Sequence, residues 1–314
     1  MNIQQLEYII AVDNFRHFAK AAEVCCVTQP TLSMMIQKLE DELDVKIFDR
    51  TKHPVEPTTI GKQIIEQARI SLKYFKQIKE VAENEQDTVK GSFKLGIIPT
   101  IANYLVPVLL HQHHTAYNEI ELTLKESTTS NLIKEILNGT LDGGVLAGPL
   151  NHPGLIEYPV YYEKFYAYVS PLDDVYKEKE INLDEIDIQA VWLLENEHCL
   201  RGQIERLCQL KKKSYAGDAH AIRYESGSID TLIHVVDYNP GFTIIPEMHA
   251  MGLSEEKQEN LRAFKNTTAV REVSLVISTE YVRKAMLNSI LEIIKRSVPK
   301  SMQDPKLKAY VVDL

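Results

Sequence analysis

The sequence lacks long apolar runs, a cysteine framework and any excess of positive charge. No stretch of about 18 apolar residues occurs in the 314-residue chain, so no membrane-spanning helix is expected. The N-terminus has neither the basic segment nor the apolar core of a secretory signal, which predicts a cytoplasmic protein. Four cysteines without a CxxC pair or a Cys/His cluster of zinc spacing exclude a disulfide-stapled fold and predict neither a metal nor another cofactor.

Positive charge is scarce even where a nucleic-acid-binding segment would need it. The net charge is −9, and residues 1–58 contain six Lys or Arg against nine Asp or Glu. A generic attraction to phosphate is therefore excluded, and any DNA binding must come from a locally shaped surface. What is present is an ordinary globular composition, 44% hydrophobic and 25% charged, in a chain long enough for two or three units.

The first part of the chain has the spacing of helices. Residues 3–49 read as helical, and 51–57 form a turn between two short extended pieces. A helix capped by Thr58 or Thr59 then runs to about residue 87. Along it lies one apolar stripe of Ile60, Ile64, Ala68, Leu72, Phe75, Ile78 and Val81. A rod about 40 Å long with one such stripe predicts a symmetric dimer, and packing on its own domain is the alternative.

Beyond a hinge at Gly91 the pattern changes to alternating strands and helices. This alternation predicts an α/β fold with a mostly parallel sheet and helices on its faces. The length fits two lobes joined by crossing strands, and the cleft between lobes is the default ligand site. We therefore expect a head at 1–58, a linker helix and hinge at 59–90, and a two-lobed domain at 91–314.

The sharpest local pattern is a helix–turn–helix that begins at Phe18. Ala21 and Ala22 allow two helices to approach closely, and Thr28 can cap a second helix that has Pro30 in its first turn. The exposed half of that helix carries polar side chains suited to base edges in a major groove: Gln29, Thr31, Ser33 and Gln37. Two cations, Arg50 and Lys52, lie where a wing would meet phosphates. A helical hairpin used for protein contacts is the alternative.

Cys199 and Cys208 are the cysteines whose neighbours indicate chemistry. His198 and Arg201 place hydrogen-bond donors or positive charge beside Cys199, which favours the thiolate that oxidants attack, and a second thiol can condense with the resulting sulfenic acid. If the segment is helical, nine residues separate the two cysteines by about 13–14 Å, whereas a disulfide needs Cα atoms within about 7 Å. The helix would have to unwind, and the bond would stabilise the rearranged chain by about 2–3 kcal/mol before strain is subtracted. The alternative is that both are small buried hydrophobic residues.

The motifs of the first 61 residues resemble those of LysR-type transcriptional regulators. The matching runs are Ala21-Ala22, Thr28-Gln29-Pro30-Thr31-Leu32-Ser33, Leu39-Glu40, Phe48-Asp49-Arg50 and Pro57-Thr58-Thr59-Ile60-Gly61. The resemblance covers essentially the whole chain. It implies a winged helix-turn-helix, a dimerising linker helix and a two-lobed domain like that of periplasmic binding proteins, hence a regulator of promoter DNA and not an enzyme. Asp44 departs from the pattern, which has glycine before the wing.

The thiol segment resembles that of the peroxide-sensing members of this family. The matching residues are His198-Cys199-Leu200-Arg201 with Cys208, Ile98-Pro99-Thr100, Thr128-Thr129 and Arg271. The resemblance implies that hydrogen peroxide oxidises Cys199, that Cys208 resolves the product, that Thr100 and Thr129 line the peroxide pocket and that Arg271 lies close to the thiol. It also implies a homodimer that assembles to a homotetramer, control of antioxidant genes with RNA polymerase, and reduction by glutaredoxin or thioredoxin. Gly202 and the run Leu210-Lys211-Lys212-Lys213 depart from the pattern.

Other functions stay open at this point. A LysR-type regulator with a small-molecule inducer in the cleft would keep the fold without redox chemistry, and it would still respond after Cys199→Ser. A thiol peroxidase would use the same cysteines in rapid turnover, but the N-terminal motif would then have no purpose. A solute-binding receptor is disfavoured by the missing signal peptide.

Overall fold

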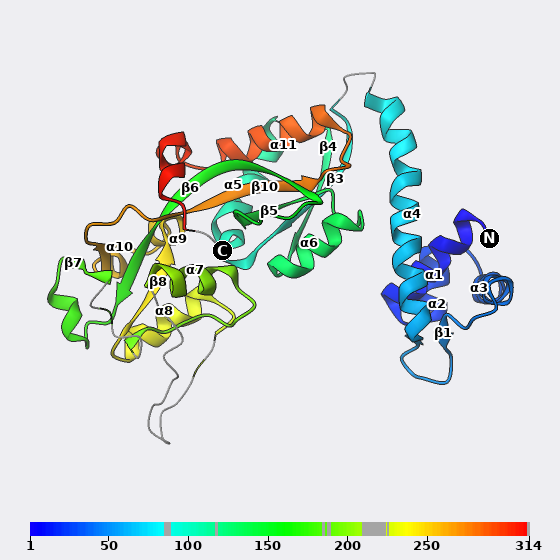
Figure 1. The fold of residues 1–314 in the computed structure, drawn as a ribbon, viewed down its shortest axis with the longest axis horizontal. Helices are drawn as coiled ribbons and strands as arrows, with labels where there is room; N and C mark the ends of the chain where they lie inside the picture. The colour runs from blue at the N-terminus through cyan, green and yellow to red at the C-terminus, as the bar shows by residue number, and fades with distance from the viewer. Residues whose placement is uncertain are drawn as a thin grey trace. The chain divides into compact units, whose positions relative to one another are not determined.

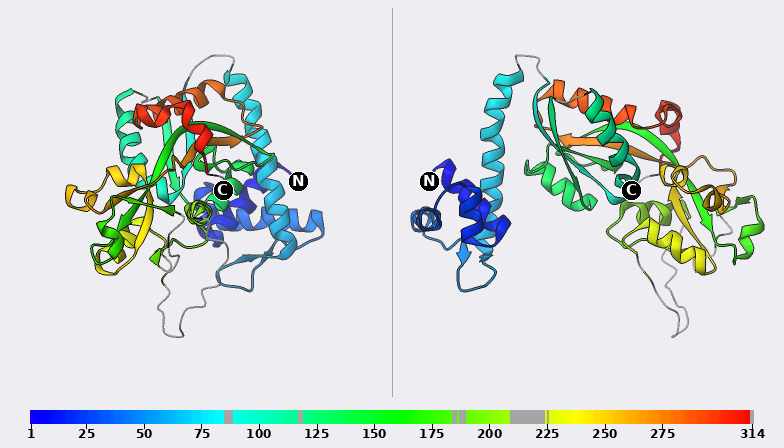
Figure 2. Two further views of the ribbon diagram at one scale, coloured as in Figure 1. Left: turned by 60° about the vertical axis from the view of Figure 1, so that its left-hand side comes forward. Right: turned by 180° about the vertical axis from the view of Figure 1, so that it is seen from behind.

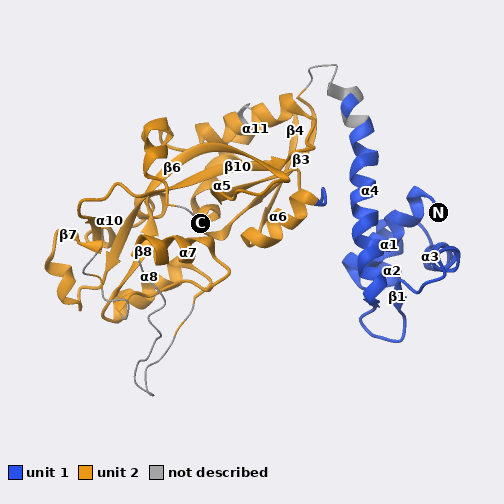
Figure 3. Ribbon diagram, viewed as in Figure 1, with its two compact units in different colours: residues 1–88, 138–140 blue, residues 89–137, 141–314 orange. Residues whose placement is uncertain are grey.

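A computed structural model describes residues 1–84, 89–116, 119–183, 186, 190–208, 224 and 226–312. The chain divides into two compact units, residues 1–88 and, apart from a turn at 138–140, residues 89–314 (Figure 3). Two sequence predictions lie outside the described residues: the end of the linker helix at 85–88, and the run from Leu210 to Lys213. Within the described ranges, no helix is both long and apolar enough to cross a membrane.

Unit 1 is a helical head with a short wing and one long helix. Its helices are α1 (Ile3–Phe15), α2 (Phe18–Val24), α3 (Gln29–Leu43) and α4 (Thr59–Asn84), and its antiparallel wing strands are β1 (Phe48–Asp49) and β2 (Glu56–Pro57). The first three helices gather beside the first half of α4 (Figures 1 and 2). Their shared core includes Ile9, Val12, Leu32, Ile36 and Leu39.

Local signals set the boundaries of the predicted helix–turn–helix. The side chain of Thr28 accepts a hydrogen bond from the backbone N–H of Thr31 and so caps α3. Pro30 lies in the first turn of that helix, where its missing N–H leaves no bond unmade. Ala21 and Ala22 are buried between α2 and its neighbours. The helix–turn–helix interpretation of this segment is therefore confirmed.

The apolar stripe predicted along α4 serves the head only over its first half. Ala68 of the stripe and the neighbouring Ile65 are buried in the core of the head. Further along, Phe75, Ile78 and Val81 are exposed. Packing on its own domain thus accounts for part of the first half of the stripe, although Ile60 is exposed, and the second half presents large apolar side chains to solvent.

Asp44, the residue that replaces the family's glycine, ends α3 in the left-handed region. Its φ is 53° and its ψ 39°, and its backbone N–H donates to the carbonyl oxygens of Glu40 and Asp41. A side chain in this region costs about 1 kcal/mol that glycine avoids. We expect Asp44→Gly to raise the free energy of unfolding by up to about 1 kcal/mol, once the chain entropy of glycine is subtracted.

Urea denaturation of the full chain, followed by circular dichroism, measures this effect. The matched control is Asp41→Gly, three residues earlier within α3, which is expected to destabilise the head by about 0.5 kcal/mol. A loss of stability in Asp44→Gly as well would contradict the prediction.

Unit 2 is a two-lobed α/β domain built on one mixed sheet. Its strands are β3 (Gly91–Ile97), β4 (Ile120–Glu126), β5 (Gly143–Gly148), β6 (Leu155–Val169), β7 (Glu180–Ile181), β8 (Phe242–Pro246), β9 (Leu261–Phe264) and β10 (Val270–Ser278). Its helices are α5 (Pro99–Ala116), α6 (Thr129–Leu137), α7 (Cys199–Leu207), α8 (Ile229–Tyr238), α9 (Glu247–Met251), α10 (Glu255–Gln258) and α11 (Lys284–Arg296), with short 3-10 turns at Asp174–Lys177, Lys300–Gln303 and Pro305–Tyr310. The strand order is β4-β3-β5-β10-β6-β9-β7, and β8 also pairs with β6.

The expectation of a mostly parallel sheet is wrong. The pairs β3–β4, β3–β5 and β7–β9 are parallel, but β10 runs antiparallel to both β5 and β6, and β6 antiparallel to β8 and β9. The chain leaves the first lobe along β6 and returns along β10, so these neighbours must run in opposite directions. The segment 190–194 forms two isolated bridges, Val191 to Phe242 and Leu194 to Ser226.

Strand β6 is the long element that periodicity did not predict. It contains Pro159, and proline argues against a central strand because it cannot donate a hydrogen bond to its neighbour. The sheet accommodates it at a bulge. Pro159 lies opposite Ser274, and the residue before Ser274 in β10, Val273, lies opposite Tyr161. Val160 is therefore the extra residue, and the ladder resumes beyond it.

Two separate hydrophobic cores define the lobes. The long strand β6, in green, contributes to both, and β10, in orange, lies beside it and contributes to the core of lobe 1 (Figure 1). Strand β6 contributes Tyr161 to the core of lobe 1, with α5, α6 and α11, and Phe165 to that of lobe 2, with α7 and α8. Cys199 packs against the core of lobe 1, and Cys208 belongs to that of lobe 2. The two thiols therefore reside in different cores.

Candidate functional site

Cys199 is the first residue of α7, a helix of lobe 2, and it faces lobe 1. Its side chain is partly buried against lobe 1, where its thiol hydrogen-bonds with Thr129, the first residue of α6. Its own backbone N–H and that of Leu200 also stabilise the charged sulfur. Amide donors at the start of a helix favour a thiolate, because they carry the partial positive charge of the helix dipole.

The full charge that acts on this thiol is Arg271, on β10. Arg271 is completely buried, and its Nε donates to Oε1 of Glu163 at 2.6 Å. Its Nη1 donates to the hydroxyl oxygen of Thr100 at 3.1 Å, and its Nη2 to the carbonyl oxygen of the same residue at 3.2 Å. Oε2 of Glu163 accepts from the backbone N–H of Met248 at 3.1 Å. The structure thus brings Thr129 and Arg271 to Cys199, and Thr100 holds the guanidinium of Arg271.

Burial and charge oppose each other at this thiol. Burial is the largest influence and raises the pKa of Cys199, while the Arg271 charge and the Thr129 hydrogen bond lower it, and the pKa stays above its ordinary value. The adjacent carboxylate of Glu163 raises the pKa of Arg271, so the guanidinium stays charged. At neutral pH the resting thiol is therefore mainly protonated, and the site stabilises its minor thiolate form.

The expectation that Arg201 supplies charge beside Cys199 needs correction. The Nε of Arg201 donates to Oε1 of Glu205 at 3.0 Å, and its Nη1 to the carbonyl oxygen of Leu194 at 2.9 Å. His198 is the residue before α7, and its side chain makes no capping hydrogen bond. Arg271 takes the place that was expected of these two neighbours.

Gln203 is a residue of this site that the sequence analysis missed. It follows Cys199 by four residues in α7, and residues at this spacing lie on one helix face. Its side chain is fully buried, and neither its Nε2 nor its Oε1 has a hydrogen-bond partner in the part of the chain described. A buried polar group without a partner costs about 1–3 kcal/mol. The amide is therefore suited to receive a small polar molecule.

Cys208 lies at the other end of α7. Its backbone N–H donates to the carbonyl oxygen of Ile204 at 3.0 Å, and burial raises its pKa to about 12. The helix between the two free cysteines confirms the spacing assumed from the sequence, about 13–14 Å along its axis. Gly202 lies within this helix with open space around it, and a glycine there weakens the helix by about 1 kcal/mol relative to alanine.

A small cavity adjoins Thr100 in the same domain. Its volume is about 70 Å³, and its lining consists of Pro99, Thr100, Asn103, Glu126, Gly227, Ser228 and Ile229. Pockets for organic ligands usually measure about 300–1,000 Å³. This cavity therefore suits only molecules close to water in size. Across the described ranges, no three His, Cys, Asp or Glu side chains come together as metal ligands.

In unit 1, α3 carries the side chains predicted to read bases. Gln29, Thr31 and Gln37 are exposed and Ser33 is half-buried. Lys52, in the wing turn, is exposed, and its Nζ forms an ion pair with Oε2 of Glu56 at 2.6 Å. The predicted residues of α3 and the wing are therefore exposed or half-buried, and both predicted cations are paired with carboxylates of the head.

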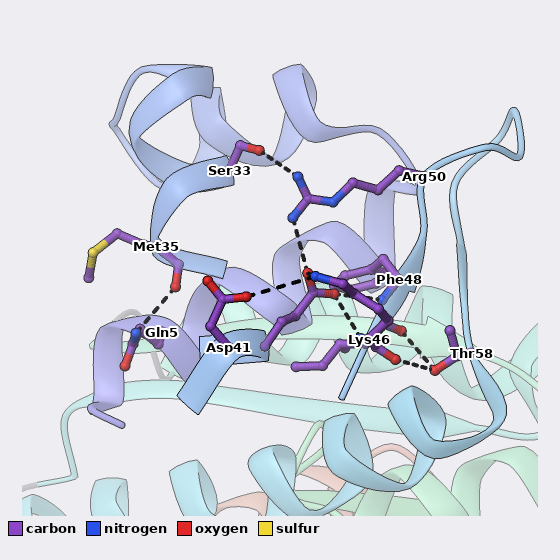
Figure 4. A network of polar contacts seen from close by, with 10 residues as sticks. Gln5, Ser33, Met35, Asp41, Lys46, Phe48, Arg50 and Thr58 are labelled. Carbon is purple, nitrogen blue, oxygen red and sulfur yellow. Dashed lines mark hydrogen bonds and ion pairs between the residues drawn. The ribbon is translucent and has the colours of Figure 1, made fainter. Parts of the chain in front are cut away.

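Arg50 is held by its own domain. Its Nη1 donates to the hydroxyl oxygen of Ser33 at 3.0 Å (Figure 4). Its Nη2 donates to Oε2 of Glu40 at 3.3 Å, and its guanidinium lies 5.1 Å from the ring centre of Phe18. The carboxylate of Glu40 is buried, and its Oε1 accepts from the backbone N–H groups of Ile47 and Phe48 at 2.7 and 3.1 Å. This network fixes the wing to α3, and we place Arg50 in it as a positioning residue.

Removal of the Glu40 carboxylate is expected to loosen this junction. Glu40→Ala should lower the free energy of unfolding by about 2–4 kcal/mol, because two buried N–H groups lose their acceptor. Glu40→Gln keeps an acceptor oxygen of the same size and should cost about 1 kcal/mol. Urea denaturation compares the two variants. Equal losses of stability in the two variants would contradict the prediction. The effect would then come from the ion pair between Glu40 and Arg50, which both variants remove, and not from the backbone contacts.

A winged helix–turn–helix head, a long helix and a two-lobed α/β domain together define a DNA-binding regulator with a separate sensing domain. The family described as "Bacterial regulatory helix-turn-helix protein, lysR family" matches residues 3–62, and the "LysR substrate binding domain" matches residues 86–299. The chain belongs to the LysR family of bacterial regulators, as its motifs predicted.

Similar proteins include named peroxide regulators. The chain is 33% identical to the "Hydrogen peroxide-inducible genes activator" of Haemophilus influenzae over 82% of this chain and 84% of that one. It is also 33% identical to the "DNA-binding transcriptional dual regulator OxyR" of Escherichia coli, over 79% and 80% of the two chains. Its fold matches a full-length OxyR variant from Pseudomonas aeruginosa with a TM-score of 0.76 and 28% identity, covering 94% of this chain and 98% of that one.

Proposed function

We propose that this protein is a transcription regulator that senses hydrogen peroxide through Cys199 and Cys208. The observation that carries the proposal is the placement of one thiol at a helix start, beside Arg271 and Thr129, with a second thiol at the end of the same helix in another core. The names of the similar proteins support the same signal. Thr100, Thr129 and Gln203 would form the polar lining that receives peroxide.

The chemistry takes two steps. The Cys199 thiolate attacks one peroxide oxygen, an S–O bond forms as the O–O bond breaks, and the leaving hydroxide takes the thiol's proton to give sulfenic acid and water. The Cys208 thiolate then attacks the same sulfur, an S–S bond forms as the S–O bond breaks, and a second water leaves. Peroxide gains two electrons and the two thiols lose them.

The second step demands a change of shape. With a pKa of about 12, buried Cys208 is almost entirely protonated at neutral pH, and the helix keeps it beyond the reach of Cys199. Unwinding of α7 would both expose Cys208 and bring the sulfurs together. The rearranged domain would then alter how the paired heads engage an operator with two-fold symmetric half-sites.

Strengthening α7 should therefore slow the second step. Gly202→Ala adds helix propensity worth about 1 kcal/mol, so disulfide formation is expected to slow by up to about fivefold while sulfenic acid forms at the same rate. Stopped alkylation at successive times with mass spectrometry separates the two products. The matched control is Arg206→Ala on the exposed face of α7, which changes helix propensity little. An unchanged rate of bridging in Gly202→Ala would mean that unwinding does not limit the reaction.

The further partners follow from the same proposal. The exposed second half of α4 supports a homodimer, which would assemble to a homotetramer on promoter DNA in the cytoplasm and act with RNA polymerase on antioxidant genes. The chain would divide into a head at 1–58, a linker at 59–90 and a redox-sensing domain at 91–314. The signal would pass from the redox-sensing domain through the linker to the head. Glutaredoxin or thioredoxin would reduce the disulfide, and the protein would act stoichiometrically and not as an enzyme.

Peroxide titration of the full chain tests the proposal. Micromolar peroxide should yield an intramolecular bridge between Cys199 and Cys208, detected by mass spectrometry after alkylation. The absence of this bridge would overturn the sensor function. The rival regulator with an organic inducer predicts that Cys199→Ser still responds to its ligand.

A further inference from the structure

Met34 is a large apolar side chain on the solvent face of α3. It is 63% exposed, although it lies within the helix that carries the predicted base-reading residues. Met35, the next residue, packs at the edge of the head's core, and its carbonyl oxygen accepts from Nε2 of Gln5 at 3.2 Å (Figure 4). The two neighbouring methionines thus have different surroundings, and Met34 contributes little to the packing of the head.

Helix geometry places Met34 at the centre of the outer face. Leu32, Ile36 and Leu39 are fully buried and define the inner face of α3. At 100° per residue, Met34 points directly away from the mean direction of these three. The residues three or four positions away, which share its face, are Pro30, Thr31, Gln37 and Lys38, and all four are exposed. A helix that entered a major groove by this face would bring Met34 to the base edges first.

The chemistry of the groove limits what an apolar side chain there can recognise. Thymine presents a C5 methyl group in the major groove, whereas the other base-pair edges present hydrogen-bond donors and acceptors. The methionine side chain is unbranched and polarisable, so it adapts to the position of such a methyl group. Resting on the proposed DNA-binding function, we propose that Met34 is a specificity-determining residue that contacts a thymine methyl group in each half-site.

The test removes the methyl groups from the DNA and the thioether from the protein. The probe is the duplex that the wild-type chain selects from a random-sequence pool, with each thymine of a symmetric pair replaced by deoxyuridine. At the one symmetric pair of thymines that Met34 contacts, the wild-type chain should lose affinity for the uracil duplex. A buried methyl group is worth about 0.8 kcal/mol, so the loss should be about fourfold for each methyl group and about 15-fold when both half-sites are changed. Met34→Ala should bind the thymine duplex about as weakly as wild type binds the uracil duplex, and should not distinguish the two.

The matched control is Met251→Ala, because Met251 is 58% exposed and lies in the other unit. This variant should keep the full preference for thymine. Equal sensitivity of wild type and Met34→Ala to uracil at every position would overturn the assignment of Met34, while selection itself would still support DNA binding. Failure of the wild-type chain to select any sequence would overturn the DNA-reading function and the inference with it.

Discussion

In the Cys208→Ser variant, peroxide is expected to convert Cys199 to sulfenic acid and to produce no intramolecular bridge. The first step needs only the thiol beside Arg271, whereas the second needs the sulfur that the variant lacks. A sulfenic-acid-specific label read by mass spectrometry should therefore rise to nearly one per chain. Circular dichroism should retain the helical signal of α7, because nothing draws the two ends of that helix together.

The experiment is best done in a Cys25→Ser/Cys26→Ser background, because Cys26 is exposed and can form bonds between chains. Cys199→Ser in the same background is the matched control and should take up no label at all. Labelling of Cys208 in that control would reverse the assigned roles of the two thiols. A full loss of label in Cys208→Ser would show that the first oxidation also depends on the second cysteine.

Replacement of Arg271 by methionine is expected to be the most destabilising single change in the sensing domain. Arg271 and Glu163 are both completely buried, so the variant leaves a carboxylate in the interior without its counter-charge. Breaking such a pair from one side costs about 3–5 kcal/mol, which urea denaturation of the full chain can measure. Glu163→Gln in the same chain should recover much of this loss, because the double variant buries no charge.

Arg271→Met and the double variant Arg271→Met/Glu163→Gln separate the effect of Arg271 on stability from its effect on the reactivity of Cys199. Arg271 lowers the pKa of the Cys199 thiol, so either variant should raise it further and slow the reaction with peroxide at neutral pH. The double variant should regain stability and stay slow. If its oxidation rate returned to the wild-type value, the guanidinium would be a structural group without influence on the thiol.

The DNA-reading head was the most predictable part of the fold because its signals are local. Thr28, Pro30 and the alanine pair act within a few residues of their own positions, and the wing follows from a short turn. The network that orders the head was not predictable in the same way. Glu40 and Arg50 join α3 to the wing. No periodic pattern in the sequence predicts that a carboxylate in α3 accepts hydrogen bonds from backbone N–H groups at the start of the wing.

The thiol site shows why nearness in sequence misled. Arg201 follows Cys199 by two residues, and side chains at that spacing on a helix do not face each other, so Arg201 turns to Glu205. Arg271 reaches the thiol only because β10 returns through the sheet, and its partner Glu163 lies 108 residues earlier in the chain. The family resemblance indicated Arg271; composition and spacing could not.

The paired strands β6 and β10 have a mechanical consequence for signalling. Their ladder pairs all nine residues of β10 with β6. A clam-shell closure, in which the two lobes rotate toward each other as in a two-domain binding protein, would therefore have to break hydrogen bonds inside the sheet. A local event near α7 meets no such obstacle. The domain therefore suits a signal made in α7, which lies outside this ladder and carries one thiol in contact with each core, and oxidation would be transmitted by a rearranged α7 while β6 and β10 stay in register.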